Sequence, residues 1–248
     1  MIFDSILYEK RGKIAYITIN RPEKLNALHA PANMEMKEAF TDFANDEKVW
    51  VAILTGTGDK AFSAGNDLKY HSKNVKKAIP SLAALAEGIG DPQVRNRGTI
   101  GGSIANNDPA ADYPSACIAL NATIHTNNRK IKAESFFKGM FETSLKKGEI
   151  IEAVEFEIPK KSSYQKLPNP ASRYAIVGVY VAKLKKEIRV AITGVESCVF
   201  RCKKLEGALT NNFSASAIDN VNISCKGFNS DIHASAEYRA HIIKVMTK

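Results

Sequence analysis

The part of this sequence best suited to hold a ligand is a glycine-rich stretch, RNRGTIGGSIANNDPAADYP, which runs from Arg95 to Pro114. Its glycines let backbone donors approach an anion closely, and two hydroxyls add to them. These residues are Gly98, Thr99, Gly101, Gly102 and Ser103. The stretch contains neither G-x-G-x-x-G nor G-K-[ST], so it is neither a Rossmann fingerprint nor a P-loop. We predict a phosphate- or cofactor-binding loop from Arg97 to Asp112, with a plain connecting loop as the alternative.

Two aspartates in this stretch could also contact a ligand. Asp108 and Pro109 predict a turn. The Asp112 carboxylate could orient the polar edge of a ligand or cap the helix that follows, and the sequence leaves both open. The five histidines, in contrast, show no paired spacing, which favours surface or core positions over a metal site.

The composition describes a globular chain with a basic surface. Of its 248 residues 44% are hydrophobic, and 35 Lys and Arg against 26 Asp and Glu give a net charge of +9. The lysines occur singly or in pairs, without interleaved aromatics, which favours a solvated surface over a nucleic-acid site and leaves an acidic protein partner open. The four cysteines show no metal-ligand spacing, which favours buried thiols. Without a membrane span or a signal-peptide pattern, we expect a cytoplasmic protein.

The first elements that must position these residues are two strands, a helix and a third strand. Residues 6–20 hold two β-rich runs around an Arg-Gly pair, which indicates a hairpin. Residues 33–47 carry apolar side chains at helical spacing. From Val49 to Gly56 the chain is continuously apolar, which is typical of a strand buried on both faces. We expect Trp50 to pack in a core beside it.

The rest of the chain alternates short β-like runs with helical patterns. Residues 122–158 hold the runs ATIHT, KIKAES and IIEAVEFEI, and two longer strands follow over residues 173–196. Helical patterns cover residues 203–209 and 234–245. We therefore expect a small antiparallel sheet covered by helices, an α+β layer.

Two motifs near the N-terminus carry a first family resemblance. INRPEKLNAL, from Ile19 to Leu28, and AFSAGNDL, from Ala61 to Leu68, resemble the opening of the crotonase, or enoyl-CoA hydratase, family. In that family the first motif lines the coenzyme A site, and the second supplies a backbone N–H to a thioester oxyanion. The resemblance covers about residues 5–71 and implies a truncated crotonase-like α/β fragment that could bind an acyl-CoA.

This resemblance ends before a hydratase site is complete. It stops between His71 and Lys77, and the following sequence has neither the family's second oxyanion loop nor its acid and base glutamates. An oxyanion donor without proton transfer leaves the hydration reaction unfinished. The sequence therefore disfavours hydratase activity.

The segment IGDPQVRNRGTIGGSIANNDPAADYP carries a second resemblance. It is similar to the second flavin-binding segment of the FAD-binding medium subunit in the carbon monoxide dehydrogenase and xanthine dehydrogenase group of molybdenum hydroxylases. Later segments, among them ASRYAIVGVYVAK, resemble the C-terminal domain of the same subunit, so the resemblance covers about residues 76–248. It implies FAD as cofactor, and a molybdenum-cofactor large subunit and an iron–sulfur small subunit as partners.

The same resemblance implies roles for individual residues. The segment from Thr99 to Ser103 would wrap the FAD diphosphate through backbone amides, and the chain up to Asp112 would border the ribityl chain and ring. Tyr174 would shield the isoalloxazine, although a strand aromatic packed in a core is the plain alternative. The implied FAD-binding residues are Thr99, Ile100, Gly101, Gly102, Ser103, Asn107, Asp108, Asp112 and Tyr174. No catalytic residue and no metal ligand is implied.

Only the second half of that family's flavin site is recognisable. Its first FAD loop, of the type A-G-G-x-S-L, has no counterpart in residues 1–90, where the crotonase-like fragment stands. We expect an α+β fold: a partial, PCMH-like FAD-binding subdomain, then a small antiparallel sheet with covering helices, all preceded by the truncated crotonase-like α/β fragment. The expected domains are residues 1–75, 76–160 and 161–248.

Three functions stay open on this basis. The chain could be an FAD-binding, electron-transferring subunit whose site is impaired by the missing half, an acyl-CoA-binding protein, or a gene fusion without function. The strand from Val49 to Gly56 lacks the neighbours of a complete crotonase. Unless it packs on the flavin half, we expect it to expose apolar surface and promote association.

Overall fold

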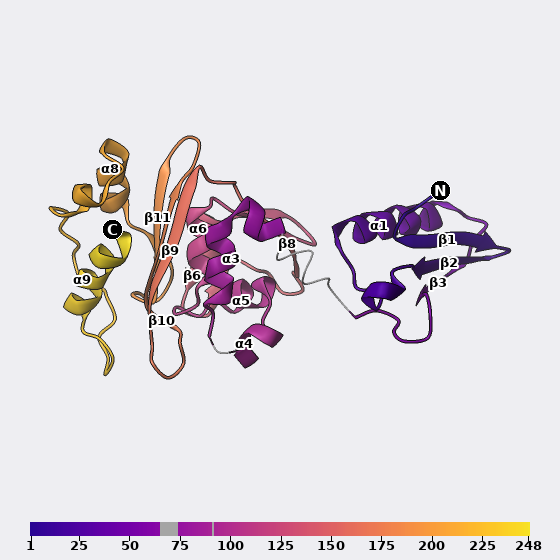
Figure 1. The fold of residues 1–248 in the computed structure, drawn as a ribbon, viewed down its shortest axis with the longest axis horizontal. Coiled ribbons are helices and arrows are strands. Elements are labelled where there is room, and N and C mark those ends of the chain that lie inside the picture. The colour runs from indigo at the N-terminus through magenta and orange to yellow at the C-terminus, as the bar shows by residue number, and fades with distance from the viewer. Residues whose placement is uncertain (65–73, 91) are drawn as a thin grey trace. The chain divides into compact units, whose positions relative to one another are not determined.

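The computed structural model describes residues 1–64, 74–90 and 92–248, and the chain divides into two compact units. The first unit is Met1–Asn74 and the second is Val75–Lys248. Each has its own sheets and its own apolar core (Figure 1). The expected domain boundary at residue 160 falls inside the second unit, and the division of that unit into two domains stays a prediction.

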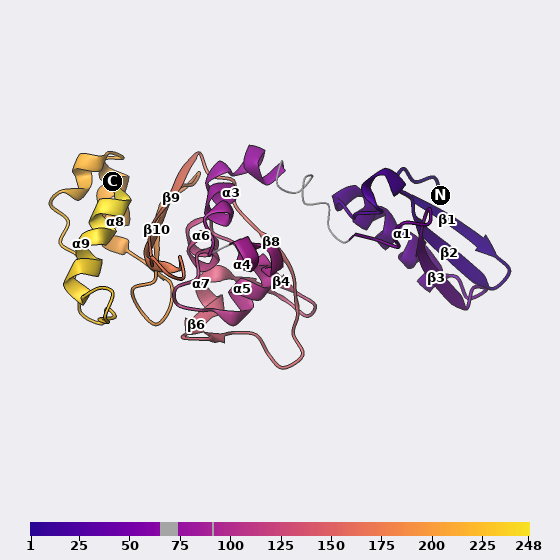
Figure 2. The ribbon, with the colours of Figure 1, turned by 60° about the horizontal axis from the view of Figure 1, so that its bottom comes forward.

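The first unit is a three-stranded sheet with a helix on one face (Figure 2). Its elements are β1 (Ile6–Arg11), β2 (Ile14–Ile19), the short 3-10 helix η1 (Pro22–Lys24), α1 (Ala30–Asn45) and β3 (Val51–Gly56). β1 and β2 form the predicted antiparallel hairpin, and β3 pairs with β2 in parallel. Ala39 of the predicted helix packs on Ile6 and Ile17 to form a small core.

The prediction that the apolar run from Val49 to Gly56 is buried on both faces is wrong. β3 is an edge strand, in which Val51 is 52% exposed and Ile53 is 39% exposed. Trp50 is 67% exposed rather than packed in a core, and the Lys13 ammonium lies 3.2 Å from its ring centroid. An apolar strand is buried only where each face has a covering layer, and the described part of the first unit supplies a helix on one face. The exposed apolar surface expected from the missing neighbours is therefore present.

The second unit is an α+β layer with helices on both faces of its central antiparallel sheet (Figures 1 and 2). The strand order is β12-β11-β10-β9. The layer consists of α6 (Tyr113–Ala119), β9 (Lys161–Pro168), β10 (Ala175–Lys183), β11 (Ile188–Thr193), β12 (Phe200–Arg201), α8 (Lys203–Asn211), η2 (Ala215–Ile218) and α9 (Ala236–Thr247). The two predicted long strands and the two predicted C-terminal helices are confirmed.

β10 contributes to two apolar cores because its side chains alternate between the faces of the sheet. Tyr180 and Ala182 belong to the core that includes α6, whereas Val177 and Val179 belong to the core that includes α8 and α9. None of these four side chains is more than 1% exposed. The helical layers therefore hold β10 in place from both faces of the sheet.

Shorter elements surround the glycine-rich stretch. They are α3 (Pro80–Glu87), α4 (Pro92–Arg97), α5 (Ile100–Asn106), β4 (Thr123–Thr126), β5 (Lys130–Lys132), α7 (Ala133–Phe136), β6 (Phe137–Gly139), β7 (Glu142–Thr143) and β8 (Ile151–Glu155). The three predicted runs form the sheet β5-β4-β8, except that the end of KIKAES is helical. The buried Ala133 and Phe136 explain this end, because they pack in the core as one helical turn.

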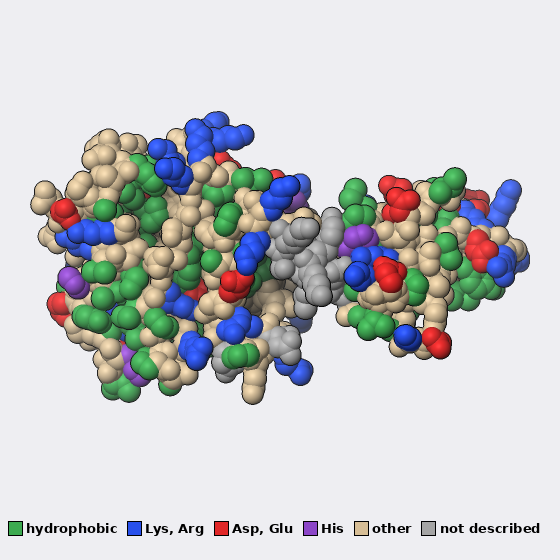
Figure 3. Space-filling view, in the orientation of Figure 1, with side chains coloured by type: hydrophobic (Ala, Val, Ile, Leu, Met, Phe, Trp, Pro, Cys, Tyr) green, Lys and Arg blue, Asp and Glu red, His purple; other side chains and the backbone are tan. Residues whose placement is uncertain are grey.

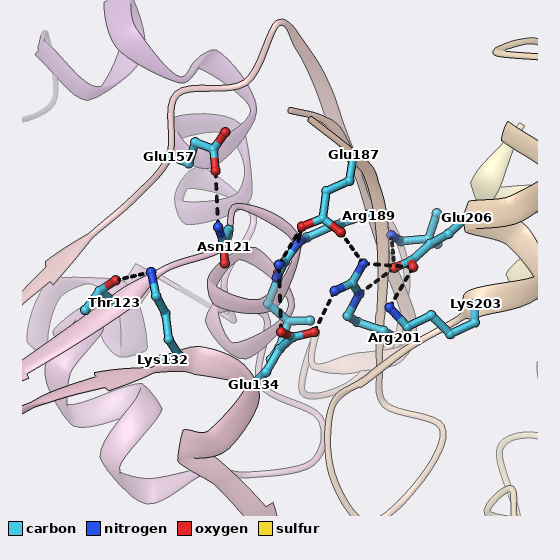
Figure 4. Close-up of polar contacts among 12 residues, drawn as sticks. Asn121, Thr123, Lys132, Glu134, Glu157, Glu187, Arg189, Arg201, Lys203 and Glu206 are labelled. Atoms are coloured by element: carbon cyan, nitrogen blue, oxygen red, sulfur yellow. Dashed lines mark hydrogen bonds and ion pairs between the residues drawn. The ribbon is translucent and has the colours of Figure 1, made fainter. Parts of the chain in front are cut away.

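An ion-pair network joins α7 to the central sheet and α8 (Figure 4). Arg201 of β12 lies 2.6 Å from Glu134, 2.8 Å from Glu187 and 2.7 Å from Glu206. Arg189 pairs with Glu187 at 2.6 Å. The two arginine side chains are only 11% and 6% exposed, so their charges depend on these partners for the interactions that water would otherwise supply.

Candidate cofactor-binding site

Most of the glycine-rich stretch is helical. Thr99 is the N-cap of α5, and its Oγ1 accepts a hydrogen bond from the Gly102 N–H at 3.0 Å. The prediction of a loop from Arg97 to Asp112 is therefore wrong over Ile100–Asn106, because a threonine cap satisfies an early helical N–H and starts a helix despite two glycines. The N–H groups of Ile100 and Gly101, in the first turn, have no hydrogen-bond partner in the described parts of the chain.

A cavity of about 430 Å³ lies beside α5. Its wall is formed by residues between Ala86 and Tyr113 together with Tyr174, which immediately precedes β10. The predicted FAD-binding residues that line it are Thr99, Gly102, Ser103, Asp108, Asp112 and Tyr174. The wall does not include Ile100, Gly101 or Asn107. The fold thus brings the glycine-rich stretch and the distant Tyr174 to one cavity.

Asp112 is a buried, paired carboxylate in this wall. It is 3% exposed and accepts hydrogen bonds from the Tyr164 hydroxyl and from Lys166 Nζ, the latter at 3.1 Å. Burial raises the pKa of Asp112, and the Lys166 ammonium opposes this rise. Asp112 occupies the N-cap position of α6, but its side chain makes no capping hydrogen bond, so the capping interpretation is wrong.

Lys166 is a site residue that the sequence analysis missed. Besides Asp112, its ammonium donates to the carbonyl oxygens of Gly88 at 2.8 Å and Arg173 at 3.0 Å. It therefore ties the end of α3 and the segment before Tyr174 to the cavity wall. A lysine on a polar edge strand normally points to water. The available signal was the alternation in β9, which places Tyr164 and Lys166 on the same face of the strand.

Two arginines add positive charge to the cavity. Arg95 is fixed in place because its guanidinium donates to the carbonyl oxygens of Ile89 and Gly90, both at 2.9 Å. Arg97, the last residue of α4, lines the cavity and is exposed. Positive charge in a concave wall favours an anionic ligand such as a phosphate.

Asn107 and Asp108 form hydrogen bonds within the protein. Asn107 is 1% exposed, and its Nδ2 donates to the carbonyl oxygens of Gly139 at 2.7 Å and Glu142 at 2.8 Å, which holds the β6–β7 hairpin against the end of α5. The Asp108 carboxylate accepts from the Ala110 N–H at 2.8 Å, which confirms the predicted turn. Asp108 also lines the cavity, whereas the Asn107 amide is engaged away from it.

The crotonase-like loop is described only in part. The fully buried Asn26 donates to the carbonyl oxygens of Thr57 at 2.9 Å and Ala61 at 2.8 Å and thereby fixes the start of the loop. Of the predicted oxyanion loop from Ala61 to Leu68, the residues from Gly65 onward lie outside the described residues, as does His71. Acyl-CoA binding by this unit stays a prediction.

Other classes of site find no support in the described residues. No group of three His, Cys, Asp or Glu side chains there could hold a metal ion. None of the helices described is both long and apolar enough to cross a membrane. Lys and Arg side chains occupy separate spots on the face of the second unit that Figure 3 shows. All four cysteines are free; Cys117 and Cys202 are buried as expected, whereas Cys198 and Cys225 are partly exposed.

Two family models match the chain. The FAD binding domain in molybdopterin dehydrogenase matches residues 61–161, and the enoyl-CoA hydratase/isomerase model matches residues 9–86. The matches overlap over residues 61–86, where the character of the sequence changes. Both resemblances expected from the sequence are confirmed.

Individual relatives agree with these two matches. The glyceraldehyde dehydrogenase medium chain of Sulfolobus acidocaldarius is 36% identical over 209 residues, covering 75% of this chain and 73% of the relative. Carbon monoxide dehydrogenase from Hydrogenophaga pseudoflava, in a form lacking the Mo-pyranopterin moiety, is similar with a TM-score of 0.62 and 28% identity, over 87% of this chain and 84% of that chain. The short-chain-enoyl-CoA hydratase of Clostridium acetobutylicum is 44% identical over 68 residues, 27% of this chain and 26% of the relative.

Proposed function

We propose an electron-transfer function for this chain on the premise that it belongs to the family of FAD-binding medium chains of molybdenum hydroxylases. FAD, when bound, accepts electrons and passes them on, and the protein contributes the position and surroundings of its ring. The observation that carries the proposal is the single cavity at which Thr99, Asp112 and Tyr174 meet beside two arginines.

The residues around the cavity suit a flavin cofactor. Arg95, Arg97 and the lining residues Thr99, Gly102 and Ser103 of the predicted segment would hold phosphate oxygens. Gly102 leaves room for the Thr99 cap in this wall, since an added Cβ would lie 3.1 Å from Thr99 Oγ1. The turn from Asn107 to Asp112, with Asp108, would border the ribityl chain and ring, and Tyr174 would cover the ring face.

We further infer that the chain is a fusion whose site binds FAD more weakly than a complete site would. A crotonase-like fragment stands where the family has its first FAD loop. Each charge-assisted hydrogen bond contributes roughly 1.5–3 kcal/mol. Because every ~1.4 kcal/mol changes affinity tenfold, the loss of several such bonds would leave micromolar affinity.

The proposed partners are those of the family. The relative from Sulfolobus acidocaldarius is named a medium chain, which implies an enzyme of several chains. We propose a molybdenum-cofactor large subunit and an iron–sulfur small subunit as partners of this chain, with electrons reaching the flavin through the iron–sulfur subunit.

Acyl-CoA binding is a second hypothesis with narrower support. The matching region spans about a quarter, 26%, of the hydratase relative, although Asn26 does hold the start of the loop in place. An acyl-CoA therefore serves as the second ligand in the test below.

The test is a titration of the purified full chain with FAD and, separately, with an acyl-CoA, preceded by a visible absorbance spectrum. We expect saturable FAD binding that the Gly102→Val variant weakens at least about tenfold, because the new side chain presses on the Thr99 cap and so displaces this part of the cavity wall. Gly207→Val is the matched control: Gly207 is also helical, and an added Cβ there meets no atom within 4 Å. An unchanged FAD affinity in Gly102→Val would show that FAD does not bind in this cavity. Saturable acyl-CoA binding without FAD binding would favour the second hypothesis.

A further inference from the structure

The cavity beside α5 has less room than a dinucleotide occupies. Its volume is about 430 Å³. Pockets for drug-sized ligands span roughly 300–1,000 Å³. FAD is larger than such a ligand, because it joins a flavin ring, a ribityl chain and two phosphates to an adenosine. The cavity therefore accommodates one half of FAD.

The chemistry of the wall indicates which half this is. Its apolar and aromatic residues are Ala86, Ile89, Val94, Ala111, Tyr113 and Tyr174. Tyr113 and Tyr174 are partly buried, and burial raises the pKa of Tyr113, so that a neutral phenol faces the cavity. Aromatic side chains of this kind pack against a flat ring system in stacked or edge-on contacts. Tyr113 and Tyr174 thus offer the cavity two aromatic side chains that can contact one ring system.

The charges at the wall suit a single terminal phosphate. Asp112 is already neutralised by Lys166, at 3.1 Å, so it adds little repulsion. Arg95 and Arg97 remain as positive groups of the wall. A phosphate monoester carries about −1.5 to −2 charges at pH 7, which two guanidinium groups can offset. One ring system beside one phosphate position matches flavin mononucleotide, FMN.

We propose that this site recognises the flavin mononucleotide half of the cofactor and is indifferent to the adenosine half, so that it binds FMN as tightly as FAD. The inference rests on the proposed function, since it concerns the same cavity. It extends that function because it predicts which part of FAD supplies the binding energy. The adenosine of a bound FAD would then lie outside the described wall.

The experiment is equilibrium dialysis of the flavin-free full chain against FAD, FMN, riboflavin and ADP. We expect the Kd values of FMN and FAD to agree within about threefold, and riboflavin to bind at least about tenfold more weakly, because it lacks the phosphate. A large excess of ADP should not displace FMN. An FAD affinity more than about tenfold above that of FMN, or displacement of FMN by ADP, overturns this inference and leaves the proposed function standing. If no flavin binds, the proposed function itself fails.

A charge variant separates recognition of the phosphate from a general loss of structure. Arg97→Gln should weaken FMN and FAD about tenfold and by equal factors, and leave riboflavin binding unchanged. Lys185→Gln is the matched control, because it removes the same charge from an exposed turn between β10 and β11. An equal loss of riboflavin binding in Arg97→Gln would contradict the assignment of Arg97 to the phosphate.

Discussion

β3 and β10 are both apolar strands, yet they lie in opposite environments. β3, in the first unit, reads VAILTG, and four of its six residues are exposed. β10, in the second unit, reads AIVGVYVAK, and seven of its nine residues are buried. Layers contributed by α6 on one face, and by α8 and α9 on the other, cover β10. Among the described strands, β3 pairs with β2 alone, which leaves its other edge free.

The difference shows that an apolar sequence favours burial of a strand, whereas the neighbouring segments decide whether the strand is buried. The segments that cover β10 precede or follow it within the same unit, so both of its faces are buried. β3 belongs to a fragment that spans only 26% of its hydratase relative. Its side chains are therefore exposed because the described part of the first unit lacks a second covering layer. We expect the same kind of substitution to change the stability of the two units by different amounts.

The largest expected effect compares one charge in each strand. Val177→Asp should destabilise the second unit by more than about 3 kcal/mol, because Val177 is fully buried and an unpaired carboxylate there loses its hydration. Ile53→Asp should change the first unit by less than about 1 kcal/mol, since Ile53 is 39% exposed. Denaturant titrations measure both changes, because Trp50, the single tryptophan, reports on the first unit and far-UV circular dichroism mainly on the larger second unit. Equal losses of stability in Val177→Asp and Ile53→Asp would contradict the difference in environment between β10 and β3.

The ion-pair network of the second unit should be the next most sensitive feature. Arg201→Met removes the guanidinium from Glu206, whose side chain is 7% exposed, and leaves it with the exposed Lys203 at 3.1 Å and the Val190 N–H. We expect a loss of about 2–3 kcal/mol, less than for a fully buried pair, because Glu134 and Glu187 can recover water. Lys10→Met, which removes exposed ion pairs in the first unit, is the comparison and should change stability little. If the network contributed little to stability, Arg201→Met would lower the free energy of unfolding as little as Lys10→Met does.

Association tests the exposed strand directly. The free edge and apolar side chains of β3 should make the full chain self-associate at micromolar concentrations, and Val51→Lys should reduce this by adding a charge to the edge. Val245→Lys is the matched control, because Val245 is 48% exposed but lies on α9. Sedimentation velocity gives the size distribution. A monomeric parent chain, or an equal effect of the control, would contradict a role for β3.

The smallest expected effect is an acid sensitivity of the first unit. The Lys10 ammonium, 2.6 Å from both Asp42 and Asp46, lowers the pKa of each carboxyl. Because these pKa values lie below those of the unfolded chain, about 3.9, the stabilisation is present above that pH and is lost as the pH falls through the folded-state values. Trp50 fluorescence during acid titration should show the first unit loosening in this range. The variant Asp42→Asn with Asp46→Asn should lack that pH dependence.

The sequence predicted local elements well where a pattern repeats along a continuous segment. The hairpin of β1 and β2, the helix α1 and the strands β10 and β11 lie where their apolar periodicity placed them. It failed at α5, where two glycines suggested a loop but the Thr99 cap sustains a helix. Lys166 was missed because its partners, Gly88 and Asp112, are far away in the chain.

By itself the sequence determined the two family resemblances, the elements with a regular apolar pattern and the glycine-rich stretch, because motifs and periodicity are properties of neighbouring residues. Only the tertiary structure decided that Tyr174 reaches the cavity of that stretch, that Lys166 neutralises Asp112, and that β3 is exposed while β10 is buried. The physical reason is that burial and charge pairing depend on which distant segments pack together. The sequence shows which side chains favour burial or an ionic partner, and the packing of the layers determines which of them are buried or paired.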